Sequence, residues 1–347
     1  MRTWVMAALL LAMAQPAAAQ RRDLPVPANK GWQHAQTGVV LTATLAGLPR
    51  TKLTDLGSAE LDVAAQFNDP KVATSLTIYI FRPALQSAPV WFDRAAAQIA
   101  SRDTYGGAMA TTPVATFTRP GGTVAAGLRQ VFAPARGPYR STAVAVVPLA
   151  EWLVAVRLSS VTLTPAAMGA ELDTALAAIR WPRTATADGP VAVPVAACPT
   201  ELPVTKAKLV MPTMEDSLLG GLLGSVAASS RATAPDAAAP LCRDGNPETL
   251  YGVYRAPDAT DGYTLAIADS GRIAIVAPGI KLGDLKTSGG YGVSYRDLDG
   301  SVSTFPSFDR LPQPAQVVTL VLRGRPISRT QRGTDGKSTI NITAPSK

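Results

Sequence analysis

The stretch LTIYIFRPALQSAPVWFDRAAAQIASR, residues 76–102, decides the fold that the sequence predicts. It begins with the apolar pattern of a strand, passes through a turn that contains Pro83, and ends in an amphipathic helix pattern. Ser87 can cap the helix, and Pro89 suits its first turn, where a missing N–H leaves no bond unmade. The stretch therefore predicts a strand followed by a helix that packs back on a sheet.

The helix in this stretch has one apolar face. Trp91, Ala95 and Ile99 recur at four-residue steps, which predicts that they are buried. Asp93 and Arg94, together with Gln98 and Arg102, are expected to face water. The aromatic side chains are expected in the core, so this stretch is predicted to be a scaffold without chemistry of its own.

Further strand patterns surround this stretch, as 29 prolines and an aromatic content of only 6% already indicate for a chain of many short strands and turns. The strand-like segments are residues 38–45, 59–67, 72–81, 114–118, 124–132, 141–148 and 151–158. A second helix is predicted to begin at Thr164-Pro165, with Thr164 as its cap, and to end before Trp181-Pro182. Residues 36–182 therefore predict an antiparallel sheet with two packed helices, an α+β fold.

The rest of the chain predicts a smaller, mainly β domain over residues 198–347, after a Thr/Ala/Pro-rich linker at 183–197. Residues 20–35 are expected to be a leader segment. Strand patterns follow, with hairpin turns expected at 269–271 and 297–300. The expected strands are residues 249–255, 263–268, 272–277, 291–296, 301–305, 316–322 and 338–343.

Residues 214–240 are predicted to be a mobile insert in this second domain. The run begins with the glycine-interrupted stretch LLGGLLG, residues 218–224, and continues as an Ala/Ser/Pro-rich, low-complexity segment. The apolar stretch is interpreted either as a hook that touches a membrane or a partner, or as a short helix or loop on the domain. Another glycine-rich stretch, SGGYG at 288–292, lacks the Lys-Ser/Thr of a phosphate loop and is expected to be an inter-strand loop.

The N-terminus has the pattern of a secretory signal peptide. Arg2 precedes a short apolar run, and an Ala-x-Ala ending predicts cleavage near Ala19. No later segment has the length of a transmembrane helix, so no such segment is expected in the mature chain. We expect a periplasmic or secreted protein.

Cys198 and Cys242 are the two cysteines of the chain. An oxidising compartment outside the cytoplasm favours a disulfide between them. Two thiols without a neighbouring histidine cannot complete a tetrahedral zinc shell, so no metal site is expected there. The pair is therefore predicted to staple the second domain.

The net charge of +8 includes an excess of basic residues near the C-terminus. Outside the cytoplasm, such a tail is expected to meet anionic lipid, a glycan or an envelope partner rather than nucleic acid, or simply to be solvated. The residues proposed for anionic contacts are Arg323, Arg325, Arg329, Arg332 and Lys337.

Motifs for catalysis are sparse. His34 is the single histidine, and it is expected to be exposed in the leader segment. Asp297-x-Asp299-Gly300 lacks the later ligands of a calcium loop and predicts a hairpin turn. Glu60 and Asp62 are predicted to share one strand face, but sequence cannot show whether carboxylates face each other across a cleft. We therefore expect no catalytic, cofactor or metal residues, while carboxylate or Ser-Lys chemistry stays open.

The order of strands and helices over residues 36–182, with the step TIYIFRP…VWFDRA and the final helix ending LAAIRWP, resembles the PsbP/DcrB-like group of exported α/β/α sandwich domains. The resemblance implies an accessory or binding role without catalysis. It does not cover the second half, and the chain lacks the lipid-acceptor cysteine of lipoprotein members. The function expected is a non-enzymatic envelope binding protein; the alternatives are a protein that binds anionic lipid or glycan and a hydrolase.

Overall fold

The computed structural model describes the chain beyond its first twenty residues, apart from short segments. The described residues are 21–69, 71–182, 189–229, 232–233, 241–281, 284–333 and 337–343. The predicted signal peptide and its cleavage near Ala19 lie outside them. In this part of the chain, no helix is long and apolar enough to cross a membrane.

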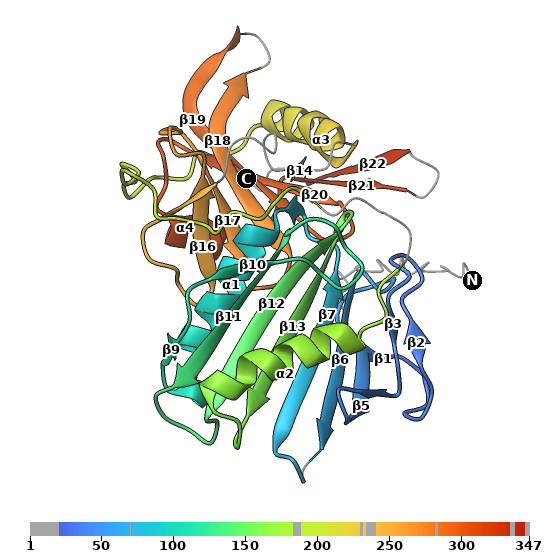
Figure 1. The fold of residues 1–347 in the computed structure, drawn as a ribbon. Helices are drawn as coiled ribbons and strands as arrows, with labels where there is room; N and C mark the ends of the chain where they lie inside the picture. Colours follow the sequence, from blue (N-terminus) through green and yellow to red (C-terminus); the bar gives the residue numbers. More distant parts are fainter. Residues whose placement is uncertain are drawn as a thin grey trace, which may run out of the picture.

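Two large antiparallel sheets make up most of the structure (Figure 1). Of the described structure, 40% is strand and 19% is helix, the latter in four α-helices. The predicted α+β class is therefore wrong, and the fold is β-rich. The physical reason is that stretches without apolar alternation, such as residues 284–290 and 328–332, still join a sheet through their backbone hydrogen bonds.

The first sheet holds ten strands in the order β1-β5-β6-β7-β13-β12-β11-β10, with β4 paired to β5 and β9 to β11. The predicted hairpin of residues 59–67 and 72–81 is confirmed as β6 and β7, which pair along eight residues. The strands are β1 (Arg22–Asp23), β4 (Thr44–Leu45), β5 (Leu48–Asp55), β6 (Asp62–Asp69), β7 (Thr74–Phe81), β9 (Ala108–Ala110), β10 (Ala115–Phe117), β11 (Gly127–Pro134), β12 (Ser141–Leu149) and β13 (Trp152–Ser160).

Helices α1 (Ala88–Ser101) and α2 (Pro165–Ala178) cover opposite faces of this sheet. Both caps predicted from the sequence are present: the Ser87 and Thr164 hydroxyls accept from backbone N–H groups in the first turns. Successive side chains of β12 point to opposite faces of the sheet: Val144 packs in the hydrophobic cluster that contains α1, and Ala145 packs in the cluster that contains α2. A short 3₁₀ turn, η1 (Asp103–Tyr105), follows α1.

The second sheet is an antiparallel meander of eight strands, each paired with the next along the chain. The hairpin turns predicted at 269–271 and 297–300 are confirmed, because they join β17 to β18 and β19 to β20. The strands are β15 (Cys242–Asp244), β16 (Tyr251–Arg255), β17 (Tyr263–Ile267), β18 (Arg272–Lys281), β19 (Asp284–Arg296), β20 (Val302–Phe308), β21 (Ser328–Arg332) and β22 (Ser338–Ile342).

Residues 316–322, predicted to be a strand, belong instead to helix α4 (Pro314–Arg323), so that prediction is wrong. Pro314 occupies the first turn, and Gln313 and Gln316 form a capping box. Val317, Val318 and Leu320 are buried in the core of the second sheet. The segment forms a helix rather than a strand because its helix-start signals and the burial of one side outweigh the strand preference of its β-branched residues.

Two short pairings complete the fold. β2 (Trp32–Gln33) pairs with β3 (Val40–Leu41) in antiparallel fashion, and β8 (Leu85–Gln86) pairs with β14 (Ala232–Thr233) in parallel. The predicted leader segment thus contributes β2, and β1 pairs with β5 at the edge of the first sheet.

Helix α1 lies between the two sheets. Trp91 and Phe81 share one buried cluster with Tyr254, Ala266 and Ile273 of the second sheet. The helix thus has two buried faces rather than one, and the two halves of the chain share a core around it.

Arg94, predicted to face water, is fully buried between α1 and the second sheet. Its guanidinium donates to the carbonyls of Ala268 (2.8 Å), Tyr251, Glu248 and Thr249 (each 2.9 Å). These carbonyls replace water as acceptors, and burial lowers the pKa of Arg94. The buried arginine therefore fixes the loop before β16 and the turn after β17 on helix α1.

The neighbouring carboxylate makes a second polar joint. Asp93 accepts from Arg243 of β15 (2.5 Å) and from the Tyr254 hydroxyl of β16 (2.6 Å). Burial, together with the Asp93 charge, raises the pKa of Tyr254, so the hydroxyl remains a donor. The face of α1 that the sequence assigned to solvent thus holds the two halves together.

Candidate functional site

The candidate site is built around helix α3 (Met214–Ser229), which forms in the segment predicted to be a mobile insert. Thr213 begins the helix: its hydroxyl accepts from Asp216 N–H (3.1 Å), and the Asp216 carboxylate accepts from Thr213 N–H (2.8 Å). This reciprocal cap offsets the weak helical tendency of the three glycines that follow. The Thr213-x-x-Asp216 spacing is typical of a helix start, so the sequence contained a signal that could have predicted α3. Residues 230–231 and 234–240 of the insert lie outside the described residues.

The glycines of α3 face the second sheet. A Cβ on Gly220 would lie 3.0 Å from Thr304 Cγ2, and one on Gly224 would lie 2.9 Å from Thr330 Oγ1. Both threonines also donate hydrogen bonds from their hydroxyls to α3, Thr304 to the carbonyl of Gly220. The small-residue face therefore allows the helix to lie close over β20, β21 and β22 (Figure 1).

A groove with a volume of about 1060 Å³ lies between α3 and strands β18, β19 and β20. Leu219 and Leu223 of α3 form its wall. The groove is also lined from the strands by Ile275, Ala277, Pro278, Gly290, Gly292, Val293, Ser294, Val302, Thr304 and Phe305. A concave, mainly apolar site of this size is typical of ligand pockets, which span about 300–1,000 Å³.

Small residues on neighbouring strands create the space in the groove. Gly292 of β19 pairs with Ala277 of β18, and Ser294 pairs with Ile275, all among the lining residues. A Cβ on Gly292 would meet only the carbonyl oxygen of Ala277, at 3.9 Å. The glycine therefore leaves open volume where a larger residue would extend into the groove.

This placement corrects the prediction for residues 288–292. They belong to strand β19, not to a loop between strands. From the sequence alone, neither of the two glycine-rich stretches, residues 218–224 and 288–292, had an assigned function. In the structure, they contribute the wall and the floor of one groove.

Polar groups gather at the end of the groove where α3 begins. Glu215, Asp216 and Asp309 carry carboxylates there. Asp309 accepts from the backbone N–H of Lys208 (2.8 Å) and from Arg310, and these bonds lower its pKa. An apolar ligand would thus have its polar end oriented by one end of the groove.

A smaller cavity of about 370 Å³ lies at the start of α1. Its lining includes Trp152, Pro148 and Val90, with residues 189–193 along one side. Those residues fall in the predicted linker, and Ala192 N–H bonds the carbonyl of Ala125 in the first half (3.0 Å).

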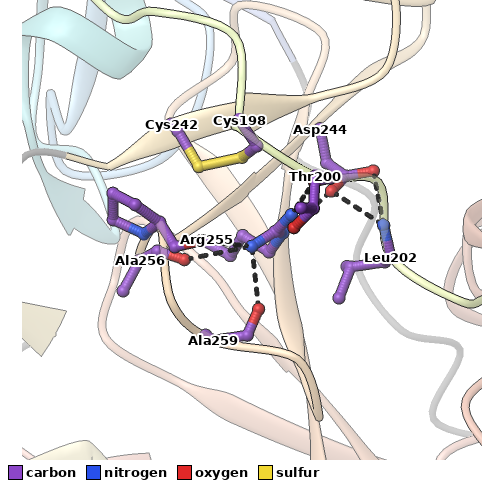
Figure 2. Close-up of a disulfide and its surroundings, with 9 residues drawn as sticks. Cys198, Thr200, Leu202, Cys242, Asp244, Arg255, Ala256 and Ala259 are labelled. Carbon is purple, nitrogen blue, oxygen red and sulfur yellow. Dashed lines mark hydrogen bonds and ion pairs between the residues drawn. A yellow bond between two sulfur atoms is a disulfide. The ribbon is translucent and has the colours of Figure 1, made fainter.

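The predicted disulfide between Cys198 and Cys242 is confirmed, with a Cα–Cα distance of 4.9 Å (Figure 2). Beside it, Arg255 donates to Asp244 (2.8 Å), and the same carboxylate accepts from Leu202 N–H (3.2 Å). The bridge and this buried ion pair fasten residues 198–202 to the first strands of the second sheet.

The five basic residues predicted to contact an anionic surface lie on two elements. Arg323 and Arg325 are exposed at the end of α4, and Arg329 and Arg332 lie on β21, with Lys337 just before β22. No observation on the described residues tests their anionic contacts, which remain a prediction.

One of these residues is already engaged: Arg329 lies 4.0 Å from Asp299 and donates to the Ser301 hydroxyl (3.3 Å). Asp297 likewise accepts from Arg272 (2.9 Å), so arginines neutralise both carboxylates of the Asp-x-Asp-Gly turn.

Among the residues that the structure describes, no group of three or more His, Cys, Asp or Glu side chains could hold a metal ion.

His34 is buried, which corrects the prediction that it is exposed. Its ring bonds the Thr37 hydroxyl (2.9 Å) and the Glu60 carbonyl (3.0 Å) and lies edge-on against Trp32 and Trp152. Burial lowers its pKa, which favours the neutral ring. The single histidine of the chain thus joins β2 to the first sheet.

The carboxylate pair Glu60 and Asp62 does not share a strand face as predicted. Glu60 lies in a left-handed turn conformation (φ 57°) before β6, and only Asp62 belongs to the strand. Burial raises the pKa of Asp62 to about 6, while the nearby Arg272 acts to lower it. Asp269, which raises it slightly further, pairs with Arg157 (3.1 Å). Asp62 thus lies in a polar cluster between the two sheets, outside both cavities.

Comparison with protein-family models, curated proteins and solved structures found no match to this chain. The resemblance of residues 36–182 to PsbP/DcrB-like domains therefore remains a prediction.

Proposed function

We propose that this is a non-enzymatic binding protein of the periplasm or the extracellular space, which holds an elongated apolar molecule in the groove between α3 and the second sheet. The observation that carries the proposal is the groove of about 1060 Å³, whose wall is leucine and whose floor combines small residues with apolar ones such as Ile275, Val293 and Phe305. Apolar ligands bind by removing their surface from water, and a preformed concave site does this without reorganising the chain.

The composition of the groove favours a chain-like ligand over a compact polar one. Leu219 and Leu223 follow each other by one helical turn along α3, so the wall is elongated. Apart from the three carboxylates beside the start of α3, the polar side chains of the lining are hydroxyls, those of Thr213, Ser294, Thr304 and Ser307. An acyl chain or the apolar segment of an envelope partner fits this distribution.

The disulfide supports export, because such bonds persist in oxidising compartments. The N-terminal signal pattern and the resemblance to an exported domain family point the same way. An accessory role, in which the protein carries or shields an apolar envelope component, is consistent with these features.

A direct test uses N-phenyl-1-naphthylamine, an uncharged apolar fluorophore, with the mature protein. We expect saturable binding with one strong site and displacement by long-chain fatty acids or alcohols. Fluorescence that rises linearly without saturation, or that short-chain alcohols displace equally well, contradicts the proposal.

A further inference from the structure

Strand β22 forms one edge of the second sheet. In the described part of the chain it pairs with β21 alone, and no strand pairs with its outer side. Its five residues, STINI, include no charge and no proline. Natural sheets usually protect such edges with charged residues, prolines or bulges, because free N–H and C=O groups recruit another strand. This unprotected edge therefore needs an explanation.

The hydrogen bonds beside β22 identify which of its backbone groups point away from β21. Thr343 N–H bonds Ile327 O (2.9 Å), and Gly333 N–H bonds Lys337 O (2.7 Å). In an antiparallel ladder, every second residue bonds the same neighbour, so odd-numbered residues of β22 face β21. The residues whose N–H and C=O groups point outward are Ser338, Ile340 and Ile342.

An exposed apolar surface lies beside this edge. Ile340 and Ile342 are each 40% exposed, and Leu218 and Leu222 of α3 are each 55% exposed. A helix turns by about 100° per residue, which places Leu218 and Leu222 on the side of Gly221, next to Ile340. Leu219 and Leu223 lie on the opposite side, in the groove. The apolar part of the outer surface is thus distinct from the leucine wall of the proposed ligand site, and the acidic start of α3 borders both.

We propose that two copies of the chain associate through β22, which pairs with itself in antiparallel fashion. The register that pairs all five residues places Ile340 opposite the partner's Ile340 and Ser338 opposite the partner's Ile342. The two-fold axis is then perpendicular to the sheet, so both α3 helices lie on the same face. Leu218 and Leu222 approach their counterparts across the seam, and one sheet runs through both copies.

Charge complementarity supports a second copy as the occupant. α3 begins with Glu215 and Asp216. It runs in the direction of β21, because Gly220 lies next to Ser328 and Gly224 next to Thr330. Its acidic start therefore lies at the end of the seam where β22 finishes.

The basic residues Arg332 and Lys337 mark the opposite end of the same seam, at the turn between β21 and β22. Antiparallel pairing brings the partner's Lys337 beside Thr343, at the acidic start of α3. The same exchange occurs at both ends of the interface. An isologous contact that is apolar in the middle and oppositely charged at its two ends suits a copy of itself.

The test is sedimentation velocity of the mature protein over a range of concentrations. We expect a dimer for the wild type. Ile340→Lys and Ile340→Glu should each raise the dimer dissociation constant at least about tenfold, because like charges then face each other directly across paired strands. An equimolar mixture of the two variants should recover a dimer, because unlike charges then meet at the two-fold axis.

A wild type that remains monomeric, or a mixture that fails to recover the dimer, overturns the proposal. Ile340 also packs near Gly221, so Ser338→Pro serves as a second variant. The N–H of Ser338 points outward, and its loss weakens the dimer without removing a bond to β21. N-phenyl-1-naphthylamine binding should persist in monomeric Ser338→Pro, because this variant keeps the contact of Ile340 with Gly221 and the groove lies on the other side of α3. The two measurements therefore separate failure of this proposal from failure of the proposed function.

Discussion

Gly221 of α3 lies directly over Ile340 of β22: a Cβ atom on the glycine would come within 2.6 Å of Ile340 Cγ2. Carbon atoms that are not bonded pack at about 3.5–4.0 Å, so this glycine sets the height of the helix above the sheet. Both surfaces proposed here depend on that height, because the groove lies on one side of α3 and the dimer edge on the other.

The substitution Gly221→Ala tests this relationship. Alanine favours a helix over glycine by about 1 kcal/mol, yet we expect the variant to lose about 1–3 kcal/mol of unfolding free energy from overpacking. Ile340→Ala removes the opposing methyl group. In urea unfolding, the double variant should therefore be more stable than the sum of the two single effects predicts.

Additive effects in this double-mutant cycle would show that the two residues do not touch. Gly169→Ala in α2 is the matched control, because a Cβ there meets nothing within 4 Å. It should stabilise the protein slightly or leave it unchanged.

Arg94→Met tests the joint between α1 and the second sheet. Methionine keeps the apolar stem but leaves the carbonyls of Ala268 and Tyr251, among others, without their donor. We expect a loss of about 2–4 kcal/mol of unfolding free energy. Arg102→Met, at the exposed end of the same helix, is the control and should change stability by less than about 0.5 kcal/mol. Equal effects of the two substitutions would contradict the buried role of Arg94.

Asp62 predicts a pH dependence of stability. Its pKa is raised to about 6 in the folded state from an ordinary value of 3.8, so the folded chain binds more protons than the unfolded chain between these values. Unfolding free energy contributed by Asp62 therefore falls as pH rises through this window, by on the order of 3 kcal/mol in full. Asp62→Asn cannot ionise and should lose this dependence.

The measurement compares urea unfolding of the two proteins from about pH 4 to pH 7. The stability of Asp62→Asn relative to the wild type should increase with pH. A difference that stays constant across this range would show that the neighbouring Arg272 fully offsets the burial of the carboxylate.

The Cys198–Cys242 disulfide closes a loop with a sequence separation of 44. Replacing both cysteines by serine should lower the unfolding free energy by about 2–4 kcal/mol, mainly because the unfolded chain regains freedom. Thiol titration of the denatured, non-reduced wild type should detect no free thiol, and a detectable thiol would contradict the pairing.

Local signals in the sequence predicted much of the backbone. The Asp269-Ser270-Gly271 turn, the Asp297–Gly300 turn and the caps at Ser87 and Thr164 each depend on a few neighbouring residues, so they survive folding unchanged. Residues 316–322 show the limit of composition, because a capping box outweighed a β-branched pattern there.

Features that depend on distant residues were not predictable in this way. Helical periodicity assigned Arg94 to solvent, but its four acceptors come from residues more than 150 positions away. His34 was assigned to an exposed leader segment, but it is buried against Trp152, which comes much later in the chain. The groove was not predicted because its glycines create empty space. Hydrophobic periodicity detects only side chains that are buried, so it gives no signal for a cavity.

The most direct test of the account is the binding of N-phenyl-1-naphthylamine to Gly292→Leu, compared with the wild type and with Gly169→Leu. A Cβ fits at Gly292 without a close contact, so a leucine there extends into the groove between β19 and α3. We predict that Gly292→Leu weakens binding at least about tenfold, or about 1.4 kcal/mol, while Gly169→Leu binds as the wild type does. Unchanged binding by a folded Gly292→Leu protein would show that the groove beneath α3 is not the ligand site.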